Sequence, residues 1–219
     1  MNKISAFKAI SLVIFSIFYA SNSIANSNWE LSKKERGISV FVSKNKISTM
    51  KSFKGVMTIN SRLSPLVKVL NDSSIYPKLF HNCKSAKTLK ELSKVESYRY
   101  MITSMPWPVK NRDFIFHSKL KQNKSNNQIV VTSNAEPKYS PLKAGMVRIQ
   151  KMKVRWILTP LKKGQVKVVY EVNVDPAGKL PKWLVNLMAV DMPFYTLKNL
   201  REIVRKSSYQ SAKLDYIND

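Results

Sequence analysis

The order of the secondary-structure patterns constrains the fold of this chain more than any single motif. Alternating runs rich in β-branched and aromatic residues recur at hairpin-like spacing, two short helices interrupt them, and one long helical pattern follows. Predicted helices cover 61–72, 74–80 and 182–207, and predicted strands cover 38–42, 52–59, 88–95, 97–104, 112–120, 128–134, 146–161 and 165–174. This order predicts an α+β fold, in which an antiparallel meander packs against a long C-terminal helix.

The C-terminal helix carries its apolar side chains near one stripe, which must cover an apolar surface. Pro193 lies inside the predicted helix, where it removes a backbone hydrogen bond and predicts a kink. Either packing offsets this cost, or the kink serves a moving lid, and both interpretations stay open. The stripe consists of Trp183, Leu187, Val190, Phe194, Leu197 and Val204.

Residues 106–113, Pro-Trp-Pro-Val-Lys-Asn-Arg-Asp, form a predicted corner between two strands. Proline fixes φ and donates no ladder hydrogen bond, so the first strand must end here. Arg112 and Asp113 then open the next strand on opposite faces, and at least one of them is expected to be buried with partners. We interpret Trp107, Arg112 and Asp113 as a structural corner with its own ion pair rather than as a catalytic site.

The first 25 residues have the pattern of a secretory signal peptide. Lys3 and Lys8 precede or flank an apolar run over 9–20, and Ser23 and Ala25 match a small-residue cleavage site. An uncleaved anchor is the alternative, but this run of about 12 residues is shorter than the roughly 20 that span a bilayer. We therefore expect cleavage near Ala25, a single domain over 26–219, and a periplasmic or secreted protein.

The chain is strongly basic, with a formal charge of +25 that falls to +23 when residues 1–25, with two lysines and no acid, are removed. Outside the cytoplasm the abundant polyanions are membrane headgroups, and export argues against nucleic acid as a partner. Lys151, Lys153 and Arg155 share one strand face without an aromatic stacking platform, so we expect them to dock transiently on an anionic membrane. The alternative is a lysine-rich surface that is merely solvated.

Cys83 is the single cysteine, so no intrachain disulfide can form.

Residues with a familiar order and spacing are spread over almost all of 26–219, and they end in an Asp-Pro-x-Gly-x-x-Pro-x-Trp segment at 175–183. Through them the chain resembles the START family, the StAR-related lipid-transfer domains, as an exported bacterial member. The residues that carry this resemblance are Trp29, Gly37, Ile38, Val40, Asp72, Pro77, Cys83, Pro106, Trp107, Pro108, Arg112, Asp113, Gly145, Val147, Arg148, Trp156, Leu158, Pro160, Tyr170, Asp175, Pro176, Gly178, Leu180, Pro181, Trp183, Leu184, Asn186, Thr196, Leu197 and Leu200.

The resemblance implies a helix-grip fold, in which a curved antiparallel sheet wraps around the C-terminal helix and leaves a hydrophobic tunnel for one lipid. Sterol-carrying members place an arginine six residues after the Arg of the Arg-Asp pair, and here that place is Ser118. The acid–arginine pair that those members place in the tunnel therefore cannot form here in the same way, which weighs against a sterol. A fatty-acyl, phospholipid or other polycyclic ligand stays open. Expected tunnel residues are Tyr98, Tyr100, Phe114, Phe116, Ser118 and Trp156 on the strands, and Trp183, Leu187, Val190, Phe194 and Leu197 on the helix.

The predicted function is that of a monomer that binds one hydrophobic ligand, without a cofactor, and carries it to or from membranes. The alternative is a helix-grip enzyme, cyclase-like or hydrolase-like, that acts on a polycyclic or polyketide-like substrate. Asp191, Glu171 and His117 would be the first catalytic candidates, although each is better explained as a solvated position. His81 and His117 are the only imidazoles and lack metal-ligand spacing, so no metal site is expected.

Overall fold

The structure, a computed structural model, describes residues 28–43, 51–178 and 180–219. The expected signal segment and its cleavage site lie outside the described residues. The helices are α1 (Leu63–Asn71), η1 (Ser73–Ile75), α2 (Tyr76–Leu79), η2 (Lys162–Gly164), α3 (Lys182–Val204) and α4 (Ser207–Gln210). The strands are β1 (Trp29–Glu35), β2 (Ile38–Ser43), β3 (Lys51–Asn60), β4 (Cys83–Ser93), β5 (Glu96–Thr103), β6 (Arg112–Gln122), β7 (Ile129–Ala135), β8 (Val147–Arg148), β9 (Met152–Leu161) and β10 (Gln165–Val174).

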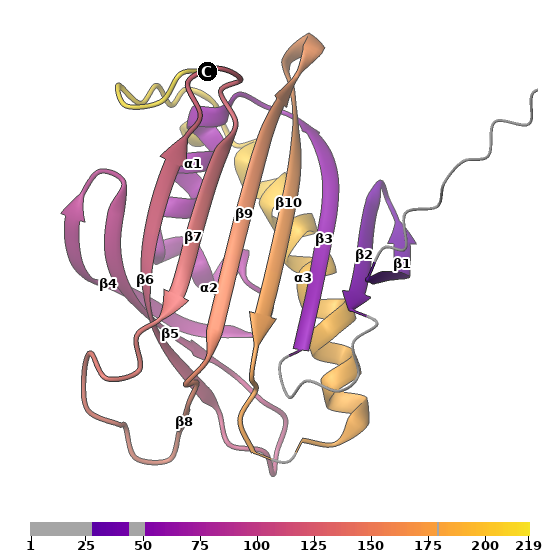
Figure 1. Ribbon diagram of the computed structural model, residues 1–219, viewed down its shortest axis with the longest axis vertical. Helices are drawn as coiled ribbons and strands as arrows, with labels where there is room; N and C mark the ends of the chain where they lie inside the picture. The colour runs from indigo at the N-terminus through magenta and orange to yellow at the C-terminus, as the bar shows by residue number, and fades with distance from the viewer. Residues whose placement is uncertain (1–27, 44–50, 179) are drawn as a thin grey trace, which may run out of the picture.

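One large sheet contains all of these strands, in the order β1-β2-β3-β10-β9-β7-β6-β5-β4 with β8 beside β6 (Figure 1). The meander predicted for the second half of the chain is present, because β4, β5, β6, β7, β9 and β10 pair consecutively and antiparallel. The predicted strand over 146–161 is divided, since residues 149–151 leave the ladder between β8 and β9. The short strand β8 instead pairs in parallel with the start of β6.

Alternation along the strands places one apolar row on the inner face of the sheet, as period-2 geometry requires. On β10 every second residue is buried and lies in the main core, whereas the residues between them are only partly buried or exposed. The same alternation on β6 points Phe114 and Phe116 inward. These rows form the inner surface against which the helices pack. The buried β10 residues are Val166, Val168, Tyr170, Val172 and Val174.

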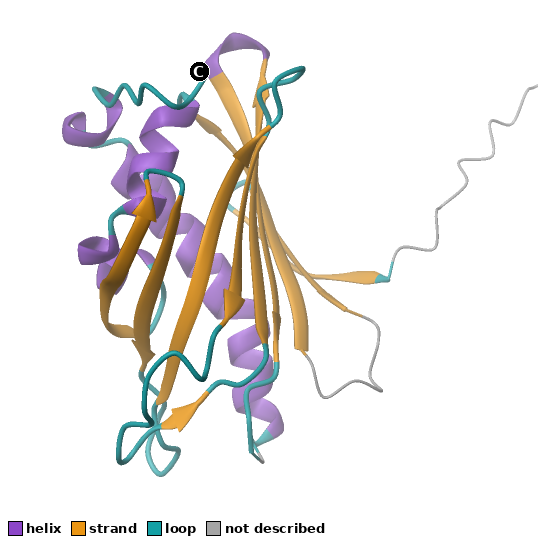
Figure 2. Ribbon diagram, turned by 60° about the vertical axis from the view of Figure 1, so that its left-hand side comes forward, coloured by secondary structure: helices purple, strands orange, loops and turns teal. Residues whose placement is uncertain are grey.

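Helix α3 crosses the inner face of the curved sheet and packs on β2 and β3 (Figure 2). The closest approach is at Gly55 of β3, where an added Cβ would lie 2.5 Å from Cδ1 of Leu197 and 3.6 Å from Cβ of Pro193. Glycine is therefore needed at this point for the helix to lie so close to the strand. The helix continues through Pro193. A curved antiparallel sheet around a long C-terminal helix confirms the helix-grip fold.

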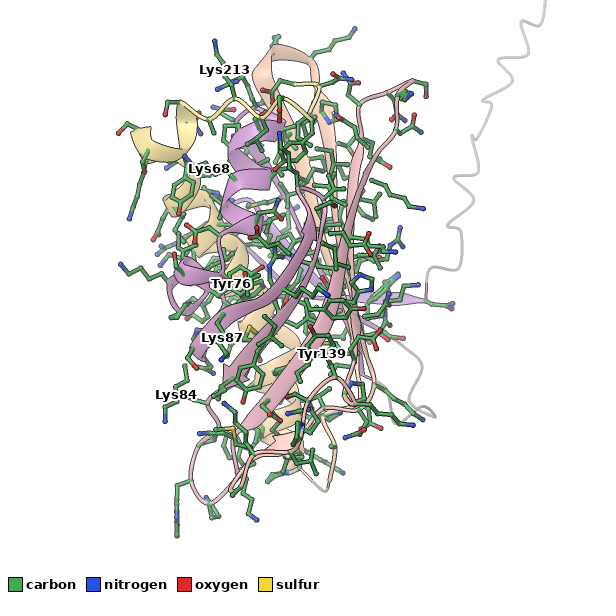
Figure 3. All side chains as sticks on the ribbon, turned by 90° about the vertical axis from the view of Figure 1, so that its left-hand side faces the viewer. Lys68, Tyr76, Lys84, Lys87, Tyr139 and Lys213 are labelled. Carbon is green, nitrogen blue, oxygen red and sulfur yellow. The ribbon has the colours of Figure 1, made fainter. Side chains whose placement is uncertain are left out.

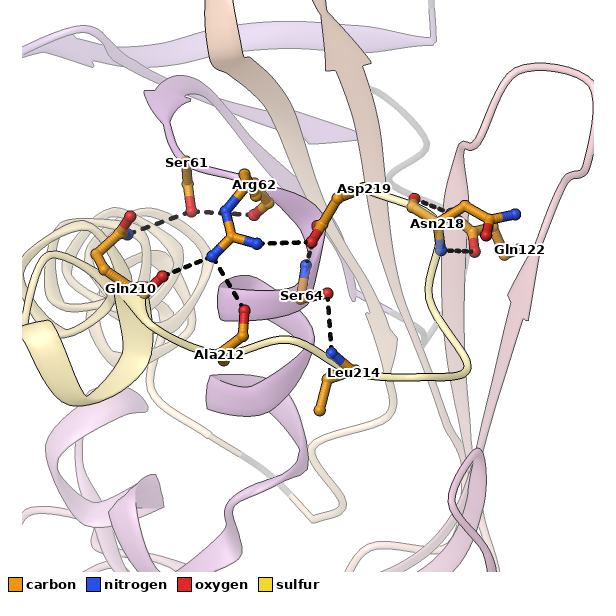
Figure 4. A network of polar contacts seen from close by, with 9 residues as sticks. All are labelled: Ser61, Arg62, Ser64, Gln122, Gln210, Ala212, Leu214, Asn218 and Asp219. Carbon is orange, nitrogen blue, oxygen red and sulfur yellow. Dashed lines mark hydrogen bonds and ion pairs between the residues drawn. The ribbon is translucent and has the colours of Figure 1, made fainter.

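The C-terminal segment covers the N-terminus of α1, at the opposite end of the molecule from the start of α3 (Figures 1 and 4). Asp219 accepts hydrogen bonds from the backbone N–H of Ser64 at 2.6 Å and from Nη1 of Arg62 at 2.9 Å. Nη2 of Arg62 also donates to the carbonyls of Gln210 and Ala212. The first turn of α1 contains no acidic residue of its own, so Asp219 supplies the negative charge that stabilises this helix end.

Candidate functional site

A cavity lies between α3 and the inner face of the sheet, and we call it the chamber. Its volume is about 90 Å³ and its lining is mainly apolar. Aromatic rings form part of the wall, with Trp156 and Tyr170 stacked at a centroid distance of 4.1 Å. Burial raises the pKa of Tyr170, so this hydroxyl stays neutral and adds no charge to the lining. Together these features describe a space for an apolar group.

Methionine is the most frequent residue of the lining. Met188 and Met192 of α3 face the chamber one turn apart, and Thr196 follows on the same helical row. Methionine is unbranched and flexible, so its side chain can move to fit ligands of different shapes. The chamber can therefore widen more readily than one lined with branched or aromatic side chains. The other lining methionines are Met101, Met105 and Met152.

Arg99, Ser118 and Ser133 form one polar part of the chamber wall. The two serine hydroxyls are joined by a hydrogen bond of 2.7 Å. The buried Arg112 also lines the chamber, but its guanidinium donates to the carbonyls of Pro176 and Ala177. Arg99 and Ser118 also line a neighbouring polar pocket of about 210 Å³, so they stand at the boundary between an apolar and a polar space. Sequence reasoning did not single out Arg99, because it expected the neighbouring Tyr98 and Tyr100 to point inward, which places Arg99 on the other face.

Four of the expected tunnel residues on the strands line the chamber. Phe114, Phe116 and Ser118 come from β6, and Trp156 comes from β9. Their side chains meet there because the inner rows of the two strands face the same helix. Contact of these four residues with a ligand is part of the proposal made below.

Tyr98 and Tyr100 lie on the other face of the sheet, contrary to the prediction. In the register of β5 with β6, Tyr98 pairs with His117 and Tyr100 with Ile115, and directly paired residues share a face. Tyr98 is stacked between the rings of His117 and Tyr139, at 4.4 and 4.5 Å. Tyr100 belongs to a small second cluster with Ile115. The side chains of Arg99 and Met101 take the inward positions instead.

The predicted helix stripe also differs from the observed chamber wall, because α3 is rotated relative to the prediction. Phe194 and Leu197 are buried in the main core, and Leu197 packs against β3 rather than against the chamber. Leu187 and Val190 are half-buried and do not line the chamber. Trp183 is 57% exposed. Because several neighbours surround this helix, its apolar stripe does not identify which side faces the cavity.

The corner after β5 is tied together by buried charges, but Arg112 and Asp113 do not pair with each other. Asp113 accepts two hydrogen bonds from Arg148, at 3.0 Å from Nε and 2.8 Å from Nη2, and both side chains are fully buried. Tyr100 also donates to Asp113, and burial together with this carboxylate raises the pKa of Tyr100 to about 12. Adjacent residues of a strand point to opposite faces, so the predicted pair could not form.

The two arginines of the corner hold neighbouring loops. Arg112 points inward and donates to the carbonyls of Pro176 and Ala177, whereas Arg148 donates to carbonyls in the segment 137–141. Loops 104–111, 136–146 and 175–178 therefore meet at one end of the molecule, beside the N-terminus of α3 (Figure 1). We call this the loop end. Its position is fixed by buried guanidinium groups, although its surface is open to solvent.

The loop end exposes large apolar side chains. Trp107, predicted to belong to the structural corner, is 93% exposed, and Leu142 of the neighbouring loop is 72% exposed. Trp183 lies at the start of α3 close to these loops. These exposed side chains are accessible to an interaction partner. Among the described helices, none is both long and apolar enough to cross a bilayer.

Of the basic residues expected to dock on membranes, Lys153 and Arg155 lie on the outer face of β9, and Lys151 comes directly before this strand. Lys151 and Lys153 are exposed and lie near the loop end, whereas Arg155 is partly buried and pairs with Glu171 at 3.2 Å. Other lysines project from distant parts of the surface (Figure 3). The positive charge is therefore spread over the molecule. Figure 3 labels Lys68 and Lys213 toward one end and Lys84 and Lys87 on β4.

The three catalytic candidates do not meet, and none of them lines the chamber. Asp191 lies 3.8 Å from Lys33, Glu171 pairs with Arg155, and His117 is hydrogen-bonded to Glu96 at 2.7 Å. No group of three metal-ligating side chains occurs among the described residues.

His81 does line the chamber, and burial lowers its pKa. Its ring stacks on Tyr195, and in the part of the chain that is described no hydrogen bond joins this ring to a nucleophile or an acid.

Comparison with known proteins places these features in a family. The START domain family matches residues 17–208, which is most of the chain. The chain belongs to the START domain family. The resemblance inferred from the dispersed residues is therefore confirmed. START domains are, in general, lipid-binding or lipid-transfer domains.

Several relatives cover most of this START domain. Uncharacterized protein PA1579 of Pseudomonas aeruginosa is 31% identical over 94% of this chain and all of its own length. Bovine phosphatidylcholine transfer protein is 24% identical over 76% of this chain and 79% of its own. A solved fragment of a STAR-related lipid transfer protein from Xanthomonas axonopodis is 34% identical, with a TM-score of 0.75, over 82% of this chain and all of the fragment. Human STARD10, with a TM-score of 0.70 and 22% identity over 83% of this chain and 74% of its own, has the same fold.

Proposed function

We propose that this START domain binds one hydrophobic ligand in the chamber and carries it to or from membranes outside the cytoplasm, acting as a monomer. The observation that carries the proposal is an apolar, methionine-rich cavity enclosed between α3 and the sheet. An apolar ligand that enters such a space gains roughly 25 cal/mol for each Å² removed from water. Membership of the START family supports the same function, whereas no constellation in the chamber favours the enzyme alternative.

A whole lipid requires a wider chamber than the one observed. A cavity of about 150 Å³ in another protein accommodates benzene, and the present volume of about 90 Å³ is smaller than that. The flexible methionines can retreat, and the N-terminal half of α3 can move outward. A second small hollow, of about 10 Å³, lies beneath Val185, Met188 and Ala189 and supports movement of this half of the helix. Pro193 marks its boundary with the more deeply buried second half. We infer that ligands enter beneath this part of α3.

The loop end is the surface best suited to meet a membrane. Trp107 and Leu142 can insert into the interface, where tryptophan is favoured, while Lys151 and Lys153 lie near anionic headgroups. Each cation close to such a surface contributes about 1 kcal/mol. Because the ligand entrance and the docking surface share this end, docking and exchange can occur together.

The ligand itself is tested by extraction and mass spectrometry. The protein purified from its native source is expected to contain one lipid or lipid-like molecule per chain. An empty protein that instead converts a polycyclic or polyketide-like compound would support the enzyme alternative and overturn the carrier proposal.

Docking is tested with a matched pair of leucines. Leu142→Ala removes an exposed leucine at the loop end, and Leu161→Ala removes one at the β9–β10 turn, at the other end of the molecule. Binding to anionic vesicles, measured by co-sedimentation, should fall several-fold for Leu142→Ala and for Trp107→Ala but not for Leu161→Ala. Binding should also weaken with added salt, since charge contributes to it. Equal behaviour of the two leucine variants would contradict docking through the loop end.

Export is tested by fractionation and N-terminal sequencing of the mature protein. We expect the protein in the periplasm or medium, with Asn26 at or near its N-terminus. A chain that retains residues 1–25 in the cytoplasm would contradict this part of the proposal.

A further inference from the structure

Arg99 is a buried guanidinium on the inner face of β5, with 5% of its surface exposed. Its hydrogen-bond partners are neutral oxygens. Nη1 donates to the hydroxyl of Tyr76 at 3.2 Å, and Nη2 donates to Asn71 at the side-chain oxygen, 3.2 Å, and at the carbonyl, 3.4 Å. The Tyr76 hydroxyl in turn donates to the carbonyl of Leu70. These contacts fix the orientation of the guanidinium without neutralising its charge.

Arg99 lacks an anionic partner within the described part of the chain. No described carboxylate lies within ion-pair distance of it, and its Nε is the single buried side-chain nitrogen or oxygen without a hydrogen-bond partner among the described residues. A buried charge is costly unless it is paired, and a buried N–H without an acceptor costs about 1–3 kcal/mol. An anion that accepts from Arg99 would remove both penalties.

The surroundings of Arg99 have the form of a head-group site next to a tail site. Arg99 and Ser118 line both the apolar chamber and the polar pocket beside it. Ser118 and Ser133 add hydroxyl groups at the same polar part of the wall. The polar pocket has a volume of about 210 Å³, and besides Asn71, Lys94 and Ser97 its lining includes the carboxylates Glu91 and Glu96. Glu96 is paired with Lys119 at 2.9 Å. An elongated ligand can therefore place an apolar part among the methionines and a polar group at Arg99.

We propose that the ligand of this START domain is an anionic amphiphile, whose carboxylate or phosphate head group accepts hydrogen bonds from Arg99 while its alkyl part fills the chamber. This inference rests on the proposed function, since it assigns the chemistry of the ligand that the chamber binds. Arginine suits both head groups because its planar N–H groups form charge-assisted hydrogen bonds with their oxygens.

The test compares oleate with oleyl alcohol, which share a tail and differ in head-group charge, by calorimetric titration of the full chain. Arg99→Met removes the charge and retains an apolar side chain of similar length, and Arg205→Met removes an exposed arginine at the end of α3 as a matched control. We expect Arg99→Met to weaken oleate binding about tenfold or more, the range of a charge-assisted hydrogen bond, and to change alcohol binding less than about threefold. Arg205→Met should change neither.

The outcomes separate this inference from the proposed function. If neither compound binds the wild-type protein, the chamber is not a lipid site and the proposed function fails. If both bind and Arg99→Met weakens them equally or not at all, the carrier stands and the anionic head-group site is overturned. Arg99→Lys retains the charge and should lose less oleate affinity than Arg99→Met. Equal losses of oleate affinity in the two variants would also overturn the anionic head-group site. If Arg99→Met does not fold, an Arg99→Lys variant that binds oleate and oleyl alcohol with the same affinity would overturn the site as well.

Two further titrations identify the source of the anion. Oleoyl lysophosphatidic acid carries the same tail on a phosphate, and its dissociation constant is compared with that of oleate. The compound with the lower dissociation constant identifies the preferred head group, phosphate or carboxylate. Inorganic phosphate at millimolar concentration is expected not to displace oleate, because it lacks a tail. Displacement that disappears in Arg99→Met would show a site for free anions, and would contradict an amphiphile as ligand.

Discussion

Two buried arginines on opposite faces of the same sheet differ in what neutralises them. Arg148, in β8, makes a bidentate ion pair with Asp113 and reaches three loop carbonyls. Arg99, in β5, has neutral partners and one N–H group without an acceptor among the described residues. The first guanidinium completes a network within the protein, whereas the second leaves a charge unmatched beside a cavity.

The difference separates a structural site from a binding site. The network of Arg148 fixes the segment 137–141 against β6, and its charge is already matched by Asp113. Arg99 is held in place by Tyr76 and Asn71, so it is preorganised, but its charge is available. A preorganised, unmatched charge binds an anion without having to break an internal ion pair first.

The largest expected effect is on the structural side of this comparison. Asp113→Asn leaves the buried Arg148 without a counter-charge and should destabilise the fold by about 3–5 kcal/mol, measured by urea denaturation. Glu171→Gln, which breaks the partly exposed pair with Arg155, is the control and should cost about 0–1 kcal/mol. Similar small losses for both variants would mean that the buried pair does not hold the corner.

The proposed binding role of Arg99 is tested by the increase in the free energy of unfolding that a bound ligand causes. Oleate at about one hundred times its dissociation constant should raise the free energy of unfolding of the wild-type protein by about 2.7 kcal/mol. At the same oleate concentration Arg99→Met should gain much less, because its affinity is lower. Equal gains in thermal or urea unfolding would show that Arg99 does not contribute to binding.

A smaller effect is expected from the partner that orients Arg99. Tyr76→Phe removes the hydroxyl that accepts from Arg99 and donates to Leu70, so it should cost about 1 kcal/mol of stability. It should also weaken oleate binding less than Arg99→Met does, because the charge remains. Calorimetric titration and urea denaturation of this variant measure both quantities. A larger loss of affinity than in Arg99→Met would assign the head group to Tyr76 instead.

The fold could be predicted from the sequence because its signals are spread along the chain. Alternating strands, turn residues and the terminal helix each agree with one meander around one helix, and the family resemblance rests on residues from most elements. The corner was also visible in its prolines. Its ion pair was not, because Arg148 lies 35 residues from Asp113 and meets it only through the parallel pairing of β8 with β6.

The chamber wall was harder to predict because it depends on strand register and helix rotation. The register pairs Tyr98 with His117, which places even-numbered residues of β5 and β6 on opposite faces, and a shift of one residue would have reversed this. Helix α3 has packed neighbours around much of its circumference, so its apolar stripe extends beyond the chamber. The rotation of α3 is set by its close approach to β3 at Gly55, and only this rotation identifies Met188 and Met192 as residues of the chamber wall.

The smallest expected effect is the most telling for the comparison. Arg99→Met removes a buried charge that has no ionic partner to leave behind, so the lost hydrogen bonds to Tyr76 and Asn71 are offset by the desolvation that is no longer needed. The free energy of unfolding without ligand should change by less than about 1 kcal/mol in either direction, against about 3–5 kcal/mol for Asp113→Asn. Urea denaturation of the lipid-free proteins measures both. A loss as large as that of Asp113→Asn would show that Arg99 is a structural residue like Arg148, and the distinction between the two faces would disappear.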